Sequence, residues 1–329
     1  MENMLLFDTA EGSSNIGDNI IMDYCERQLG NMLQYHLPYY VNKVPTHLEI
    51  GKTAYAFNKQ AKYSFVCGTN ILKATILFQK NWKLNFYDIL NLRNLCLMGA
   101  GWGNYNTYSP DPYTKWAYRT ILSKKLLHSV RDSYTERQLK LIGISNVINT
   151  ACPTMWRLTP DFCSRIPTTK SKSAVTALTY YKKDVDRDIF MLETIHKNYD
   201  EIYFWPQQVS DIDYLQSLNL KFPINMLPPI LSVYDKLLVE KDVDFIGSRL
   251  HGGIRALNNK CRTLIIGVDN RATEIHHDTN LLVLQRENID ELEGWINGDF
   301  KTEIRLPSEN IEIWKQQFNN SVGSYINNV

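Results

Sequence analysis

Short apolar runs alternate with longer amphipathic stretches along the first half of the chain. The runs of strand length are MLLFDTA, SFVCGT, NLCLMGA, LLHSVRD and SNVINTA. Between them, residues 18–33 and the segment ERQLKLIG have the spacing of amphipathic helices, and Gly143 closes the second one. Strands that alternate with helices predict a mostly parallel sheet covered on both faces.

The same rhythm restarts after residues 159–173, which are poor in apolar side chains, contain two prolines and are the best candidate linker. A chain of 329 residues is also too long for one ordinary core. We therefore predict an α/β protein with two Rossmann-like domains, residues 1–168 and 169–329. This is the GT-B-like arrangement, with a cleft between the domains, and its closing helix can pack back on the N-terminal domain.

Composition and charge narrow the class of protein. The net charge is +1, without the basic excess of nucleic-acid-binding proteins, so local Arg and Lys must meet any bound anion. The six cysteines form no CxxC pair and most lie in apolar segments, which favours reduced, buried thiols. The first residues do not form a signal peptide, and no run approaches the ~20 apolar residues of a membrane span. We expect a cytoplasmic location and no nucleic-acid partner.

The segment richest in chemistry is FIGSRLHGGIRAL at residues 245–257. A predicted strand leads into a loop with Arg249 and His251, and a helix begins near Gly252. In open parallel sheets, ligands bind at the carboxyl ends of strands, where helix N-termini present free amides. An Arg and a His at this point suit an acidic substrate and a proton transfer. The alternative is an Arg249 that pairs with a structural carboxylate and a His251 that is a satisfied core residue.

Arg131 follows another predicted strand, in the segment SVRDSYTER. Asp132 or Ser133 can cap the helix that comes next, with Glu136 completing a capping box if Ser133 is the cap. A guanidinium at the end of a strand can clamp an anion or serve as a structural ion pair, and the residues alone leave both roles open for Arg131.

Two glycine segments carry weaker signals. Near the N-terminus, the segment SSNIGD contains Gly17, which permits a tight turn, and Asp18, which can cap the following helix. The segment GAGWG at residues 99–103 begins like a dinucleotide fingerprint, but Asn104 stands where the last glycine belongs. A glycine turn after a strand explains the second segment equally well.

His276, His277 and Asp278 suggest a metal site only at first sight. Neighbouring histidines on a loop point in different directions, and no further cluster of ligands lies near them in the sequence. We expect a surface loop there and no bound metal.

Three segments together resemble the polysaccharide pyruvyl transferase family. They are Asn15-Ile-Gly-Asp18, Ser129-Val-Arg-Asp-Ser133 and Gly247-Ser-Arg-Leu-His251, with an IIGVD strand after the last. The resemblance spans nearly the whole chain, and Gly-x-Arg-Leu-His is its most specific element. It implies a GT-B-like fold and transfer of pyruvate from phosphoenolpyruvate onto a hexose of a cell-surface polysaccharide precursor. Such a reaction forms a ketal, releases phosphate and needs no further cofactor.

The resemblance also assigns candidate residues. By position, Arg131 resembles a donor-binding arginine of the N-terminal half. Arg249, Leu250 and His251 resemble the donor loop of the C-terminal half, and Gly252 follows them. After Asp269 this chain has Asn-Arg-Ala-Thr where the family often has small residues and a lysine, so Arg271 is a candidate substitute.

The implied chemistry needs a proton donor and a base. His251 is the candidate for proton transfer, because an ordinary histidine pKa near 6.5 allows both directions. Asp18 is a second candidate, as a base on the acceptor hydroxyl. The remaining acceptor-side candidates are Asn15, Gly17, Trp102 and Asn104. The acceptor is a hexose, and a lipid-linked oligosaccharide at the inner membrane face would make the enzyme peripheral there.

Aromatic and basic residues are frequent between residues 102 and 125. They can line an acceptor groove, face a membrane, or simply be core and solvated helix face, the interpretation that we favour. The residues are Trp102, Tyr105, Tyr108, Tyr113, Trp116, Arg119, Lys124 and Lys125.

Three other functions compete with the pyruvyltransferase. A GT-B nucleotide-sugar glycosyltransferase would use the helix N-termini for a diphosphate and Glu274 for the ribose. A catalytically inactive glycan-binding relative would keep the fold alone, although it has no reason to retain Arg131, Arg249 and His251. A dinucleotide oxidoreductase depends only on the interrupted glycine motif.

Overall fold

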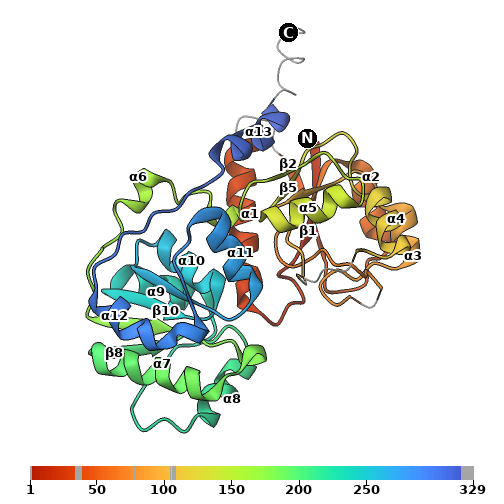
Figure 1. The fold of residues 1–329 in the computed structure, drawn as a ribbon. Coiled ribbons are helices and arrows are strands. Elements are labelled where there is room, and N and C mark those ends of the chain that lie inside the picture. The colour runs from red at the N-terminus through yellow and green to blue at the C-terminus, as the bar shows by residue number, and fades with distance from the viewer. Residues whose placement is uncertain (1, 34–38, 78, 104, 106–108, 320–329) are drawn as a thin grey trace. The chain divides into compact units, whose positions relative to one another are not determined.

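The computed structural model describes residues 2–33, 39–77, 79–103, 105 and 109–319 (Figure 1). The chain divides into two compact units. Unit 1 comprises residues 1–13, 21–156 and 307–329, and unit 2 comprises residues 14–20 and 157–306. The domain limits 1–168 and 169–329 stay a prediction. Within the described residues, no helix combines the length and the apolar character that crossing a membrane requires.

Unit 1 is built on a parallel sheet with the strand order β2-β1-β3-β4, and β5 and β6 form a second parallel pair. Several of these strands are continuous apolar runs, as expected for strands covered on both faces: every residue of β4 is buried. The strands are β1 (Glu2–Asp8), β2 (Tyr39–Pro45), β3 (Ala61–Cys67), β4 (Leu95–Met98), β5 (His128–Val130) and β6 (Val147–Asn149).

Two side chains of β5 bridge the strand pair to β4. The N–H of Leu97 donates to Nδ1 of His128 at 3.2 Å, and the N–H of Gly99 donates to Oγ of Ser129 at 2.9 Å. A backbone hydrogen bond from Arg131 to the carbonyl of Ala100 follows at 3.1 Å. The pair β5-β6 therefore extends the sheet beyond β4, and Arg131 lies at its carboxyl edge.

The helices of unit 1 pack around a large apolar core. The last helix returns to this unit, where Trp314 contacts the ring of Phe65 edge to face at 6.1 Å. The helices are α1 (Ile16–Leu33), α2 (Lys52–Gln60), α3 (Phe86–Asn91), α4 (Pro112–Ile121), α5 (Ser133–Leu141), the 3-10 turn η1 (Pro153–Met155) and α13 (Ser308–Asn319).

Unit 2 contains one parallel sheet with the strand order β12-β11-β10-β7-β8-β9. The chain proceeds from β7 to β8 in one direction and later places β10 on the other side of β7, so the topological switch point lies between β7 and β10. The strands are β7 (Ser173–Thr176), β8 (Glu201–Phe204), β9 (Asn225–Met226), β10 (Val243–Gly247), β11 (Thr263–Gly267) and β12 (Val283–Gln285). These two parallel sheets confirm the predicted α/β class.

Helices connect successive strands of unit 2, and further helices precede β7 and follow β12. They are α6 (Pro160–Cys163), η2 (Tyr180–Lys182), α7 (Val185–Asn198), α8 (Val209–Ser217), α9 (Leu231–Glu240), α10 (Leu250–Asn258), α11 (Asn270–Thr279), η3 (Arg286–Glu291) and α12 (Leu292–Asn297).

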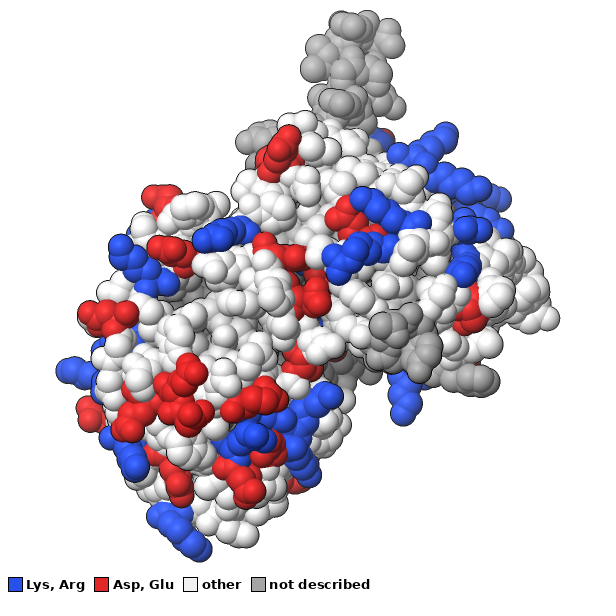
Figure 2. All heavy atoms as spheres, in the orientation of Figure 1, with Lys and Arg blue, Asp and Glu red and all other residues white. Residues whose placement is uncertain are grey.

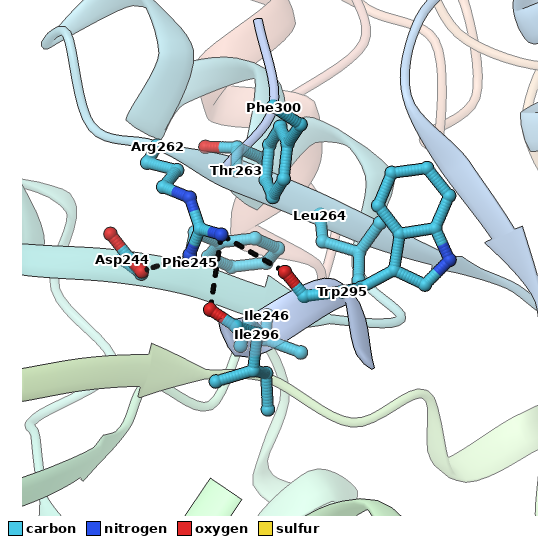
Figure 3. A pocket seen from close by; sticks show the side chains of 9 residues that line it. All are labelled: Asp244, Phe245, Ile246, Arg262, Thr263, Leu264, Trp295, Ile296 and Phe300. Atoms are coloured by element: carbon cyan, nitrogen blue, oxygen red, sulfur yellow. Dashed lines mark hydrogen bonds and ion pairs between the residues drawn. The ribbon is translucent and has the colours of Figure 1, made fainter. Parts of the chain in front are cut away.

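A buried ion pair ties α12 to the amino end of this sheet (Figure 3). Nη1 of Arg262 contacts Oδ2 of Asp244 at 2.8 Å, and Nη2 donates to the carbonyls of Trp295 and Ile296 at 2.9 and 3.1 Å. The guanidinium also lies 4.1 Å from the centroid of the Phe300 ring. One side chain thus closes the helix C-terminus and joins it to β10.

The candidate linker 159–173 contains a short helix: Thr159 caps α6, and Phe162, Cys163 and Ile166 are buried. Its role as a linker stays a prediction. One expectation from the sequence is wrong. Residues 276–278 lie in helix α11 rather than in a loop, because Asp269 caps that helix and starts it earlier than the pattern indicated. All six cysteines are buried and free, as predicted.

Candidate functional site

Arg249 follows β10, beside the switch point of unit 2. A close approach between strands places it there: a Cβ on Gly247 would lie 2.7 Å from the backbone N and O of Ala177, so only glycine fits. β10 therefore runs tight against the end of β7. The loop that leaves it carries Ser248 and Arg249 to the carboxyl edge of the sheet, where ligands of open α/β sheets bind.

A network within unit 2 holds the guanidinium of Arg249, which is 3% exposed. Nε donates to the carbonyl of Leu178 at 2.9 Å, and Nη2 donates to Oε1 of Gln208 at 3.0 Å and pairs with Asp211. Nη1 takes part in none of these contacts. The structural carboxylate considered from the sequence thus exists, and it fixes Arg249 in position while one N–H₂ group of the fork is left for another partner.

Asp211 is fully buried, and its own partners explain why it can hold a cation so rigidly. Oδ2 accepts the backbone N–H of Gln207 at 3.0 Å and that of Gln208 at 3.1 Å, and Oδ1 accepts the N–H of Tyr180 at 3.3 Å. These bonds also begin helix α8 in a capping box. Sequence reasoning missed Asp211, because nothing local marks it as more than a helix residue.

Helix α10 begins directly after Arg249, which occupies the N-cap position without a side-chain cap. Leu250, His251 and Gly252 form the first turn, and all three are buried. The first N–H groups of a helix have no acceptor inside the helix and carry the positive end of its dipole. The start of α10 therefore suits an anionic group, with the imidazole of His251 next to it.

Gln207 lies between the starts of two helices. A Cβ on Gly252 would lie 2.9 Å from Nε2 of Gln207, and a Cβ on Gly17 would lie 2.9 Å from its Oε1. The N–H of Ile16 donates to the carbonyl of Gln207 at 3.0 Å. Both glycines are therefore needed for close contact with one amide side chain. The structure brings Gly17 and Gly252, predicted independently, to the same place in unit 2.

Asn15 rather than Asp18 lies at the cap position of α1. Its Oδ1 accepts the N–H of Gly17 at 3.1 Å, and its carbonyl accepts the N–H of Asp18 at 3.0 Å. The helix begins two residues earlier than predicted, because the asparagine side chain satisfies the first free amide. Asp18 is a buried residue of the first turn.

Three buried polar atoms near the carboxyl ends of β7 and β8 have no hydrogen-bond partner among the described residues. They are Oγ1 of Thr176, Nε1 of Trp205 and Nε2 of Gln207. Buried polar groups are nearly always paired, and Nε2 of Gln207, which lies against the start of α10, is therefore a candidate donor to a ligand. Two of the three atoms are N–H donors, which again suits an anion.

Arg271 adds a second guanidinium to this side of unit 2. Nε donates to Oδ2 of Asp269 at 2.9 Å, and Nη2 donates to the hydroxyl of Tyr181 at 2.9 Å. The ring of Tyr181 lies under Arg249, with 5.3 Å between Cζ and the ring centroid. Tyr181 thus links the two arginines, and the sequence did not single it out.

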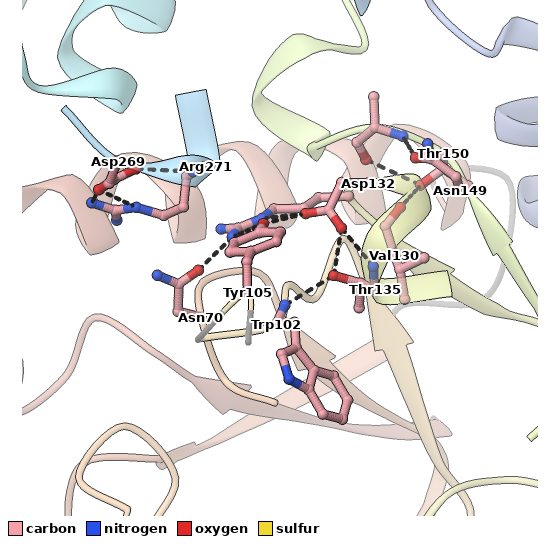
Figure 4. Close-up of polar contacts among 12 residues, drawn as sticks. Asn70, Trp102, Tyr105, Val130, Asp132, Thr135, Asn149, Thr150, Asp269 and Arg271 are labelled. Atoms are coloured by element: carbon pink, nitrogen blue, oxygen red, sulfur yellow. Dashed lines mark hydrogen bonds and ion pairs between the residues drawn. The ribbon is translucent and has the colours of Figure 1, made fainter. Parts of the chain in front are cut away.

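Arg131 belongs to unit 1, where polar side chains surround it (Figure 4). Nε contacts Oδ2 of Asp132 at 3.1 Å, and Nη2 donates to Oδ1 of Asn70 at 2.5 Å and to the hydroxyl of Tyr105 at 3.1 Å. That hydroxyl donates to Asp132 at 2.7 Å. Burial raises the pKa of Tyr105, so the phenol keeps its proton and remains a donor.

The glycine segment after β4 makes room for this arginine. A Cβ on Gly101 would lie 2.3 Å from the guanidinium of Arg131, whereas Gly99 has a φ of 65° and lies against Pro153. Both glycines serve close packing and a turn. This local role, and not a dinucleotide site, accounts for the segment GAGWG.

Asp132 caps helix α5, one of the two possibilities that the sequence allowed. Oδ1 accepts the N–H and the hydroxyl of Thr135 at 2.7 and 2.6 Å, and the same hydroxyl accepts the N–H of Trp102 at 2.9 Å. Trp102 is 1% exposed and its ring contacts Tyr118 in the core. The core role considered for Trp102 therefore holds, and its ring is not offered to an acceptor. Asn104 and Tyr108 lie outside the described residues.

Two solved structures of similar fold are of UDP-GlcNAc 2-epimerases. The UDP-GlcNAc 2-epimerase of Methanocaldococcus jannaschii has a TM-score of 0.53 and 11% identity over 97% of this chain and 100% of that chain. The enzyme of Neisseria meningitidis has a TM-score of 0.52 and 12% identity over 98% of this chain and 99% of that chain. At such identity the likeness shows the fold alone, which is the predicted GT-B-like architecture. No curated protein matches the chain in sequence.

Residues 15–270 match the polysaccharide pyruvyl transferase family. The match includes both glycine contacts of Gln207, the buried Arg131 and the loop from β10 into α10. The chain belongs to this family.

Proposed function

We propose that this protein transfers pyruvate from phosphoenolpyruvate onto a hexose of a polysaccharide precursor, forming a ketal and releasing phosphate. One observation carries the proposal: in unit 2 the fixed guanidinium of Arg249, the first turn of α10 and the unpartnered Nε2 of Gln207 lie at one sheet edge. All three are N–H donors, and phosphoenolpyruvate has a carboxylate and a phosphate as acceptors.

The donor is assigned to these groups as follows. The first turn of α10 and Gln207 bind one anionic group through N–H donors, and Nη1 of Arg249 binds beside them. Arg271, which Tyr181 holds near Arg249, is the second cation of unit 2. Arg131 is assigned to the donor on the family pattern. Its charge is already balanced by Asp132, so it acts mainly through hydrogen bonds of fixed direction.

The reaction forms two new C–O bonds at the central carbon of the donor and one new C–H bond at its methylene carbon. A proton goes to the methylene carbon, and a sugar hydroxyl attacks the central carbon, forming the first C–O bond. Loss of phosphate then breaks the bond between the central carbon and the bridging phosphate oxygen, and a second hydroxyl of the sugar attacks this carbon and closes the ketal. The two hydroxyl protons end on the new methyl group and on the released phosphate, so atoms and charge balance.

His251 is assigned to proton transfer. It lies in the first turn of α10, whose dipole disfavours the imidazolium, while a bound phosphate favours it. Binding of the donor would therefore charge the histidine when the proton is needed. Asp18, in the first turn of α1, is the candidate base for the acceptor hydroxyl.

The direct test measures inorganic phosphate released from phosphoenolpyruvate by the purified protein, with a panel of lipid-linked and aryl-linked hexoses. We expect release that depends on the acceptor, and a product heavier by one pyruvate less one water. A catalytically inactive glycan-binding relative would bind an acceptor from the panel without any release. If no acceptor causes phosphate release and phosphoenolpyruvate does not raise the melting temperature, the proposal is contradicted.

A nucleotide-sugar glycosyltransferase is the second candidate, because the structures of similar fold are of enzymes that bind UDP-GlcNAc. Helix α10 would then hold a diphosphate, and Glu274 of α11 the ribose. Tight binding of UDP, undisturbed by phosphoenolpyruvate, would favour this candidate over the pyruvyltransferase.

A further inference from the structure

Acidic residues are scarce in one stretch of unit 1, which therefore has a high net positive charge. Residues 39–130 contain 12 Lys and Arg and 3 Asp and Glu, a formal charge of +9 (12 minus 3), although the whole chain has a net charge of +1. The rest of the chain is therefore formally −8. Charge asymmetry of this kind indicates attraction to an anionic surface, and the near-neutral total conceals it.

The few acids of this stretch do little to reduce its field at the surface. Asp88 is fully buried, where it accepts the hydroxyl of Tyr55 at 2.6 Å and the N–H of Asn85 at 2.7 Å. Asp111 caps α4 through the N–H of Thr114. Of the three, only Glu49 is fully exposed.

An exposed apolar patch lies on the helices of the same unit. It consists of Phe86, Tyr87 and Leu90 of α3 and Trp116 of α4, which are between 38% and 71% exposed. The rings of Phe86 and Trp116 are stacked, with centroids 5.8 Å apart, and Tyr113 continues the cluster at 5.5 Å from Trp116. Contiguous exposed apolar residues are rare on soluble surfaces and mark interaction sites. We call these residues the aromatic patch.

A basic rim borders the patch. Its residues are the exposed Lys52 and Lys59 of α2, Lys62 at the start of β3, and Arg93 after α3. Figure 2 shows Lys and Arg gathered over α2, and mostly uncharged residues over the neighbouring α3. The hydrogen bond between Tyr55 and Asp88 joins α2 to α3. Asn91, which follows Leu90 in α3, lines one hollow with Lys59 and Lys62, so the two zones adjoin.

A hollow of about 450 Å³ lies within the rim. Its lining includes Lys59, Lys62 and Arg93 together with Asn91 of α3 and Asn58, and no acidic residue. Lys62 also pairs with Glu2 at 2.7 Å, and Arg93 donates to the carbonyls of α3, so both cations are held at the edge of the hollow. Such a recess can accept a phosphate-bearing headgroup.

We propose that this face of α2, α3 and α4 docks the protein onto an anionic phospholipid bilayer. Trp, Tyr and Phe partition into the interface between headgroups and acyl chains, and Lys and Arg reach the phosphates beside it. Proteins that bind single-stranded nucleic acid instead interleave stacking rings with cations along a groove. Here the rings and the cations form two adjoining zones, which favours a bilayer. The inference does not depend on the reaction catalysed in unit 2.

Co-sedimentation of the full chain with vesicles tests the proposal. We expect binding to phosphatidylcholine vesicles that contain phosphatidylglycerol, weaker binding to pure phosphatidylcholine, and loss of binding at high salt. The double variant Lys52→Gln/Lys59→Gln should bind about 25-fold more weakly, since about 1 kcal/mol for each basic residue is about fivefold. Tyr87→Ser/Leu90→Ser should weaken binding to both kinds of vesicle.

Matched controls come from unit 2. Val209 and Val239 are 71% and 72% exposed, and Val209→Ser/Val239→Ser should bind vesicles like the natural protein. Thermal melting checks that every variant is folded. Equal binding to neutral and anionic vesicles, full binding by the lysine variant, or no binding at all would overturn the proposal. Self-association or retention by an acidic polysaccharide, with no vesicle binding, would overturn it in favour of that other partner.

Discussion

Both candidate donor arginines are buried, and a carboxylate of the same unit holds each of them. Arg249 pairs with Asp211, and Arg131 with Asp132. A buried pair of this kind contributes little net stability, but it fixes where the remaining N–H groups point. These arginines would therefore bind a ligand mainly through N–H groups of fixed direction, because the carboxylates already balance their charge. Removal of either arginine would leave a buried carboxylate unpaired, so the neighbouring uncharged residues give cleaner tests.

His251→Gln separates catalysis from binding. If His251 transfers the proton, kcat should fall by about 10²–10⁴ while the KM for phosphoenolpyruvate changes little. Steady-state phosphate release measures both constants. His277→Gln, at an exposed position of α11, should leave both unchanged. A near-normal kcat for His251→Gln would refute the assignment and leave the family unaffected.

Gln207→Met tests the unpartnered donor. Because Nε2 has no partner among the described residues, its loss should not lower the melting temperature, yet it should raise the KM for phosphoenolpyruvate about tenfold. Gln79 provides the contrast: its Nε2 donates to the carbonyl of Ile71 at 2.9 Å, so Gln79→Met should lower the melting temperature and leave KM unchanged. An unchanged KM for Gln207→Met would remove Gln207 from the donor site.

Within each unit, side chains as well as backbone hydrogen bonds join neighbouring helices and strands. Residues of β5 connect to β4 through an imidazole and a hydroxyl, and α12 connects to β10 through Arg262. In each case a side chain is hydrogen-bonded to the neighbouring element. These junctions are therefore expected to stabilise the sheets.

The junction between β4 and β5 should be sensitive to pH. Nε2 of His128 contacts the carbonyl of Ser123 at 2.9 Å, which requires a donor, so Nδ1 is unprotonated and accepts from Leu97. Burial lowers the pKa of His128 to about 4. Below its ordinary pKa of about 6.5 the unfolded chain takes up the proton first, so stability should decrease as the pH falls from 6.5 to 4, by about 3 kcal/mol.

Urea unfolding at several pH values measures this slope. His128→Gln should be less stable than the natural protein at pH 7, and its stability should depend less on pH between 6.5 and 4. His277→Gln is the matched control and should keep the natural slope. An equally steep decrease in His128→Gln would assign the pH dependence to other groups.

Arg262→Met should destabilise unit 2 by about 3–5 kcal/mol, because it leaves Asp244 buried without its cation and frees the carbonyls at the end of α12. Denaturant unfolding measures the change. Arg165→Met removes an exposed pair with Asp161 and should cost less than about 1 kcal/mol. Equal effects of the two substitutions would mean that the buried ion pair stabilises the protein no more than the exposed one.

The whole molecule combines a proposed donor site in unit 2 with an uneven charge distribution. The groups proposed to bind the anion lie at the carboxyl edge of the unit 2 sheet, and the net positive charge lies on unit 1. In these two proposals, a few fixed donors bind a small anion, whereas a broad basic face contacts a large partner. The net charge of the whole chain reveals neither the fixed donors nor the basic face.

Ligand binding should stabilise the whole chain. Phosphoenolpyruvate at about 100 times its Kd should add about 2.7 kcal/mol to the free energy of unfolding, seen as a higher melting temperature. UDP should add less if the protein is a pyruvyltransferase. The variant Gln207→Met should respond less to the same concentration of phosphoenolpyruvate. Stabilisation by UDP alone would instead support the nucleotide-sugar enzyme.

Local sequence patterns determined the α/β class, most strands and the position of Arg249 directly after a strand. The predicted start of α10 near Gly252 was two residues late, because the helix begins at Leu250 and includes His251 in its first turn. Apolar runs and their spacing arise from burial on sheet faces, and this signal is local. The edge strand β2 and helices α9 and α11 were missed, because their apolar faces are short or interrupted. The start of α1 was misplaced by two residues, since Asn15 and Asp18 are both good caps.

Only the tertiary structure decided which distant residues meet. Nothing in the sequence indicates that Gly17 and Gly252 contact one Gln207, that Asp211 holds Arg249, or that Gly101 makes room for Arg131. These contacts join segments that are far apart in the chain, and they depend on how strands are ordered within a sheet. The sequence by itself thus determined the chemistry available to this protein. The fold decided which of those groups act together, because packing, unlike periodicity, is not a local property.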